Sequence, residues 1–203
     1  MNILARRQQW TIFICCVVIM FFSITLSAMA TPSNKKLGNG NTTYNLRITK
    51  MQCVDTPYKR SILHNCTMVH LPNNTVGLNI SVEVPIVLSF FQITVKVYYK
   101  YTTYRPFMID WTIELCQALR NRNLNPSTVF VMKVYADSLP EFYYPCPHGN
   151  RTYAFFWTLE PSYIPSTLPS GDYRLDVYYQ DSTHTTLFAF RIYGSVRKQG
   201  LIG

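Results

Sequence analysis

The sequence predicts a mainly β protein: an antiparallel sandwich or cup of two sheets, with one or two helices inserted between central strands. Apolar and polar residues alternate with a period of two through most of residues 44–194, which is the spacing of strands that bury one face. The alternating segments are short and are separated by turn-forming residues, as in sandwiches and barrels. Only one central region departs from this period.

The first strands carry the clearest alternation. Residues 44–49 alternate from the start of the predicted domain, and a shorter strand is expected at 63–70. Residues 78–84 place four apolar side chains on one face and polar side chains on the other. Residues 91–101 predict the longest strand, because five apolar side chains share one of its faces.

The central region predicts helices. A short strand is expected at 104–109, but within residues 108–122 the apolar side chains also fall in one broad helical stripe with polar residues opposite. Asn125 is a favourable cap and Pro126 a favourable first-turn residue for a second helix at 127–139. The chain then returns to strands.

Three strands complete the predicted sandwich. A short one is expected at 152–159, and residues 173–179 alternate strictly. A polar turn at residues 181–184 separates that segment from the closing strand at 188–192. Two alternating segments joined by a short polar turn predict a terminal β-hairpin.

Residues 1–30 have the composition of a signal peptide. Arg6 and Arg7 precede an apolar run, Trp10–Leu26, and Ala28–Ala30 supplies the small-residue pattern of a cleavage site. The alternative is an uncleaved anchor, because this largely apolar run of 17 residues reaches the lower limit of a membrane span of about 17–25. We expect cleavage, and therefore a secreted, extracellular protein.

The rest of the chain suits one domain. Removal of the leader would leave 173 of the 203 residues, enough for one core. We expect a flexible polar lead-in at 31–43, a single β-sandwich at 44–194 and a basic tail at 195–203. Five Asn-x-Ser/Thr acceptors predict a glycoprotein in the secretory route: Asn41, Asn65, Asn73, Asn79 and Asn150.

Cleavage would also reduce the six cysteines to four, Cys53, Cys66, Cys116 and Cys146. An even number in an oxidising compartment favours two disulfides. Three pairings are possible, and we favour Cys53 with Cys66 and Cys116 with Cys146 because each closes one supersecondary unit. A zinc site that adds His148 is the alternative, but its spacing fits no common zinc motif.

The distribution of charge in the predicted mature chain argues against nucleic acid as a partner. Loss of Arg6 and Arg7 lowers the formal charge from +9 to +7, and the remaining excess is scattered. No run of basic and aromatic residues would follow a phosphate backbone, so nucleic acid is not an expected partner. A modest attraction to acidic membrane or glycan surfaces is possible, and a solvated basic surface is the simpler explanation.

A binding cup requires apolar side chains that line a space between the sheets. Inward positions on the long strand, on the strand after Cys146 and on the last strand are the candidates: Phe91, Ile93, Val95, Val97, Phe155, Trp157, Phe188 and Phe190. The alternative for each is an ordinary packed core position, since protein interiors are close-packed. Alternation predicts burial but not a void.

Residues 155–165 do not show the regular alternation of the other predicted strands. Three consecutive aromatic residues followed by two prolines cannot form a regular two-faced strand throughout. Part of the segment should run along a sheet edge or over the mouth of a cup, where it would form a hydrophobic lip or a partner-binding patch. A loop packed onto the sheet is the alternative.

The sequence contains no recognisable catalytic motif. Asp181, Ser182 and His184 are residue types of an acyl-transfer triad, but they lie within four consecutive turn residues, whereas a triad converges in a pocket. Neither a nucleophile elbow nor a phosphate-binding glycine loop is present. The histidines lack metal-ligand spacing. We therefore expect no enzyme activity, no metal and no cofactor.

Several short motifs occur together in a characteristic order. The chain resembles a large insect family of small secreted proteins of unknown function that is related to the CheB chemosensory proteins. The resemblance covers roughly residues 44–194. It rests on Ile48, Met51 and Cys53; Asn65–Thr67; Tyr104–Phe107; Asp110, Cys116 and Leu119; Asn125 and Pro126; Cys146 and Pro147; and Leu168–Leu175.

This resemblance implies a cup distantly similar to the ML lipid-recognition proteins, such as the ganglioside activator. It also implies binding rather than catalysis, with a possible role in contact chemosensation. We expect a secreted binding protein for lipids or other hydrophobic small molecules. The alternative is a secreted glycoprotein interaction module, or an accessory to a membrane receptor, whose sandwich has no ligand cavity.

Overall fold

The computed structural model describes residues 44–72, 75–121, 124–165 and 167–198. Within these ranges the elements are β1 (Tyr44–Cys53), β2 (Ile62–His70), β3 (Val76–Leu88), β4 (Gln92–Lys100), β5 (Tyr104–Glu114), α2 (Leu115–Arg120), α3 (Pro126–Ser138), η2 (Pro140–Phe142), β6 (His148–Thr158), η3 (Pro161–Tyr163), β7 (Gly171–Gln180) and β8 (Thr186–Lys198).

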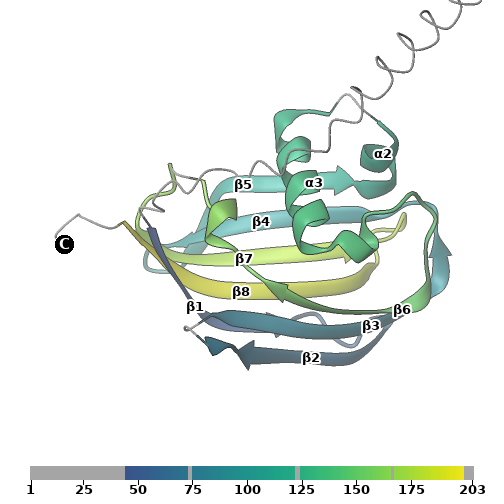
Figure 1. Cartoon of the computed structure of the whole chain (residues 1–203), viewed down its shortest axis with the longest axis horizontal. Coiled ribbons are helices and arrows are strands. Elements are labelled where there is room, and N and C mark those ends of the chain that lie inside the picture. The colour runs from purple at the N-terminus through teal and green to yellow at the C-terminus, as the bar shows by residue number, and fades with distance from the viewer. Residues whose placement is uncertain (1–43, 73–74, 122–123, 166, 199–203) are drawn as a thin grey trace, which may run out of the picture. The chain divides into compact units, whose positions relative to one another are not determined.

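The strands form two antiparallel sheets, so the predicted mainly β fold is confirmed. One sheet has five strands in the order β1-β8-β7-β4-β5, and the other has three in the order β2-β3-β6. Figure 1 shows the five-stranded sheet with α3 across the face of β4 and β5, and the three-stranded sheet beside β8 and β1. The β7–β8 pair is the predicted terminal hairpin.

Strand β3 explains how the sequence forms the smaller sheet. Its alternate side chains Leu78, Ile80 and Val82 are buried, whereas Asn79 between them is exposed. Each buried aliphatic side chain stabilises the fold by about 1.5–3 kcal/mol. A shift of one residue in register would expose all of them, so this pattern fixes the face that β3 turns to the core.

The first predicted helix is much shorter than expected. Strand β5 extends to Glu114, and only Leu115–Arg120 is helical, so the predicted helix over residues 108–122 is wrong over its first half. Ile109, Trp111 and Ile113 also alternate with polar residues, and pairing with β4 satisfies the backbone of this segment. The apolar residues of this segment thus fit the two-residue period of a strand as well as the helical stripe.

The second helix forms where the sequence predicts it. Helix α3 spans Pro126–Ser138, and the Asn125 side chain accepts a hydrogen bond from the backbone N–H of Thr128 at 2.8 Å. This N-cap satisfies one of the amide groups that the first turn leaves free. Phe130 packs edge-to-face on Trp111 of β5, with ring centroids 5.9 Å apart. The helix therefore covers the five-stranded sheet.

Both disulfides have the favoured pairing. Cys53 is bonded to Cys66 and Cys116 to Cys146, so the cysteines are not free for the alternative zinc arrangement. The first bridge connects β1 to β2 and so ties one sheet to the other. The second connects α2 to the segment that precedes β6 and closes the helical excursion.

The last strand continues further than the predicted domain. Strand β8 runs to Lys198, and Arg197 and Lys198 pair with Asn45 and Tyr44 of β1. Residues 195–198, assigned to a basic tail from their charge, therefore belong to the sheet. Arg197 also donates hydrogen bonds to Gly171 O and to Asp172 Oδ1, at 2.6 and 2.7 Å.

Some expectations fall on residues that the structure does not describe. The predicted leader at 1–30, the polar lead-in at 31–43 and the acceptors Asn41 and Asn73 lie outside the described residues. Among the helices that are described, none combines the length and the apolar character that crossing a bilayer requires.

Candidate functional site: an apolar cavity

A cavity of about 190 Å³ lies between the inner face of the five-stranded sheet and a cover. The cover consists of α3, Trp157 of β6, residues 159–165 and Leu168. All five strands of the larger sheet contribute alternate side chains to the cavity, because these side chains share one face of the sheet. Arg174 is the one charged residue among the described lining residues, but its guanidinium stacks on Tyr98 and pairs with Asp176 on the opposite face of the sheet.

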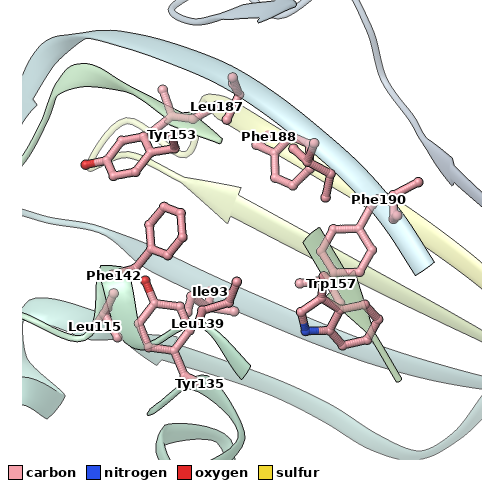
Figure 2. Packing of buried hydrophobic residues seen from close by; sticks show 14 of the residues in the cluster. Ile93, Leu115, Tyr135, Leu139, Phe142, Tyr153, Trp157, Leu187, Phe188 and Phe190 are labelled. Carbon is pink, nitrogen blue, oxygen red and sulfur yellow. The ribbon is translucent and has the colours of Figure 1, made fainter. Parts of the chain in front are cut away.

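A second cavity of about 50 Å³ lies beside the first. Tyr135, Leu139 and Tyr179 line both cavities and so lie where the two adjoin. Figure 2 shows Tyr135 and Leu139 between Phe142, which lines the smaller cavity, and Trp157, which lines the larger. The two spaces are neighbouring compartments of one apolar interior.

The eight residues predicted to line a cup all lie on one of these cavities. The larger cavity is lined by Ile93, Val95, Val97, Trp157 and Phe190, and the smaller by Phe91, Phe155 and Phe188. The structure thus brings the candidates together around two adjoining spaces. Their role in binding a ligand stays a prediction.

Sequence reasoning missed the cover of the cavity. Trp111 of β5 and Phe130, Val134 and Tyr135 of α3 line the larger space, yet none was a candidate. For Trp111 the missed signal is its alternation with Ile109 and Ile113. For α3 the pattern was visible, but which face the helix turns to the sheet depends on tertiary packing.

The segment at residues 155–165 divides into two parts. Residues up to Thr158 belong to β6, an edge strand of the smaller sheet, and Phe156 lies exposed on its outer face. The chain then turns through η3, and Tyr163, Ile164 and Pro165 line the cavity. The first part of the segment thus lies at a sheet edge, and the second part is a loop that packs over the larger cavity.

His148 is the buried polar side chain at the smaller cavity. It is 3% exposed and is held between Phe91 and Tyr144, at ring-centroid distances of 5.7 and 4.2 Å. Its Nε2 has no hydrogen-bond partner in the described part of the chain. An unsatisfied buried polar atom costs about 1–3 kcal/mol.

The protonation of His148 follows from this environment. Burial lowers the pKa of His148, a hydrogen bond with the Tyr144 backbone opposes this effect, and the charge of Arg151 adds to it. The imidazole ring donates that bond to a backbone carbonyl. Because Nε2 has no partner, the donor is Nδ1–H, and Nε2 carries the free lone pair of the neutral ring.

The tyrosines around the smaller cavity are neutral as well. Burial raises the pKa of Tyr153 to about 12, aided by a hydrogen bond with Tyr144, and burial raises the pKa of Tyr135 well above its usual value. The Tyr153 hydroxyl accepts a hydrogen bond from the Gly149 backbone N–H at 2.6 Å and lies 3.2 Å from the Tyr144 hydroxyl. The site therefore presents apolar surface and neutral polar groups.

The residues of the rejected triad form a turn. The Asp181 carboxylate accepts hydrogen bonds from the backbone N–H groups of Thr183 and Thr185 and pairs with Arg60. Burial alone would raise the pKa of Asp181, but these hydrogen bonds and the Arg60 charge lower it. The His184 side chain is exposed. Asp181 thus serves to close the β7–β8 hairpin.

The described glycan acceptors gather on the smaller sheet. Asn65 and Asn79 lie on β2 and β3, and the Asn65 side chain donates a hydrogen bond to Asn79 O at 3.3 Å. Asn150, near the start of β6, is exposed. Their glycosylation stays a prediction.

One comparison in sequence matches the centre of the chain. Residues 93–175 match a family model described as a protein of unknown function, DUF1091. The match runs from β4 into β7 and so includes α2, α3 and the second disulfide. A search of curated proteins gave no match.

Solved structures give a more distant likeness. The chain is similar to a Niemann-Pick type C2 protein from the Japanese carpenter ant, with 8% identity and a TM-score of 0.38 over 70% of this chain and 96% of that one. It is also similar to chicken MD-1 complexed with lipid IVa, with 10% identity and a TM-score of 0.34 over 78% and 99% of the two chains.

Proposed function

We propose that the protein is a secreted, glycosylated binding protein that holds a small hydrophobic molecule or lipid chain in the larger cavity without chemical change. The observation that supports this function is an apolar space of about 190 Å³ beneath α3. An engineered apolar cavity of about 150 Å³ stays dry and binds benzene, and pockets for drug-sized ligands span about 300–1,000 Å³. The expected ligand is therefore slender and largely apolar.

The cavity favours this function over the alternative of an interaction module with a solidly packed sandwich. A contribution to contact chemosensation, implied by the resemblance in sequence, is the finer form of the proposal. If the protein is also an accessory to a membrane receptor, that receptor would be a partner in addition to the bound ligand.

Paired substitutions on α3 test the proposed function. Val134 lines the cavity, whereas Val129 on the same helix is exposed. We expect the fluorescence of N-phenyl-1-naphthylamine to rise and saturate with the wild-type protein, and Val134→Phe to weaken its affinity at least tenfold by filling the space. Val129→Phe should bind as the wild type does.

Native mass spectrometry of the protein expressed in insect cells gives the complementary measurement. A co-purifying lipid supports the proposal. A ligand-free protein that also fails to take up the dye contradicts it.

A further inference from the structure

The buried Nε2 of His148 marks a place for one polar group of a ligand. His148 lines a small cavity whose other lining residues are aliphatic and aromatic, and its Nε2 has no hydrogen-bond partner within the described part of the chain. Buried polar atoms nearly always have a partner, and an exception calls for a specific explanation. A ligand that reaches this cavity would supply the partner.

The small cavity adjoins the larger one. Tyr135, Leu139 and Tyr179 line both cavities, so a ligand that extends from one cavity to the other would pass these side chains. Its volume of about 50 Å³ compares with the roughly 30 Å³ that one water molecule occupies in the liquid. It therefore has room for a hydroxyl group and the carbon that bears it, but not for a large head group.

The chemistry of the lining selects among possible end groups. A carboxylate is only an acceptor and would meet the lone pair of the neutral imidazole. An ammonium group would be buried without an opposite charge, because no described lining residue of either cavity is acidic. A hydroxyl group is uncharged, is small and donates one hydrogen bond. It is the end group that fits.

We propose that the protein binds a single-chain alcohol, with its hydrocarbon in the larger cavity and its hydroxyl group donating a hydrogen bond to Nε2 of His148. This inference rests on the proposed function of the larger cavity. Phe91 and Tyr144 hold the ring by stacking, and the backbone of Tyr144 fixes its tautomer. His148 would thus determine specificity for a donor at the end of the chain.

A pair of isomers tests the proposal. 1-Octanol and 1-methoxyheptane contain the same atoms, but only the alcohol donates a hydrogen bond. Their affinities are measured by displacement of N-phenyl-1-naphthylamine from the wild-type protein and from His148→Phe, which keeps an aromatic ring. We expect the ratio of alcohol to ether affinity to fall roughly tenfold in the variant, the effect of one buried hydrogen bond. His70→Phe, on an exposed residue, is the matched control.

A second measurement does not depend on the variant. In the wild-type protein labelled with ¹⁵N-histidine, the Nε2 resonance of His148 should move on addition of 1-octanol and stay in place with 1-methoxyheptane. If neither isomer displaces the dye and neither is bound, the proposed function itself fails. If both bind but the affinity ratio is the same in His148→Phe and the resonance does not move, the cavity function stands and the role of His148 is overturned.

Discussion

At the scale of single residues, a buried carboxylate on the outer face of the larger sheet is bound by two arginines. Asp176 is 1% exposed and accepts hydrogen bonds from Arg191 Nε and Nη2 at 2.8 and 3.1 Å. Arg174 Nε lies 3.1 Å from the same carboxylate, and its guanidinium stacks 3.8 Å from the centre of the Tyr98 ring. One carboxylate thus balances two partly buried cations.

Removal of that carboxylate should be costly. Asp176→Ala leaves both arginines without their partner, and we expect it to lower the free energy of unfolding by about 3–5 kcal/mol. Asp172→Ala, which breaks the more exposed pair with Arg197, should cost less than about 1 kcal/mol. Urea unfolding of the two variants measures the difference. Equal effects would contradict a special role for Asp176.

The buried His148 should make stability depend on pH. Its pKa in the folded protein is lowered below the unfolded value of 6.5, so below pH 6.5 the unfolded chain binds the proton first. The free energy of unfolding should therefore fall as pH falls from 6.5 to the folded pKa, by at most about 1.4 kcal/mol per pH unit.

His148→Phe isolates this contribution. The variant lacks the titrating ring, while groups such as Asp181 titrate alike in both proteins. Compared with the wild type by urea unfolding between about pH 7 and pH 5, the variant should lose less stability. Parallel pH profiles of the two proteins would contradict the prediction.

At the scale of elements, the N-cap of α3 supports the cover of the cavity. Asn125→Ala removes the hydrogen bond to the Thr128 backbone, and we expect it to lower the free energy of unfolding by about 1 kcal/mol. Lys133→Ala, which breaks an exposed pair with Asp137 on the same helix, should cost no more than about 0.5 kcal/mol. Chemical denaturation of both variants tests this, and a reversed order would refute it.

The elements also explain how much of the fold and site was predictable. The strand at residues 78–84 and the hairpin were predictable because alternation of buried and exposed side chains is a local property. The boundary between β5 and α2 was not, since residues 108–114 fit both periods and pairing with β4 decided between them. The eight cup candidates lay on inward faces, but a void arises only from packing between distant elements.

At the scale of the whole described domain, two covalent links complement the core. The bond between Cys53 and Cys66 spans 13 residues and connects the two sheets. We expect the double variant Cys53→Ala and Cys66→Ala to lose about 3 kcal/mol, which lowers Tm by about 6–12 °C for a domain of this size. Calorimetry measures the shift. An unchanged Tm would show that packing alone joins the sheets.

Two different parts of the chain form the two walls of the cavity. The paired strands of the larger sheet supply one wall, whereas α3, residues 159–165 and Leu168 supply the opposite wall and take no part in the pairing of that sheet. Substitutions in that opposite wall can therefore enlarge, narrow or reshape the space while the hydrogen-bonded framework stays intact.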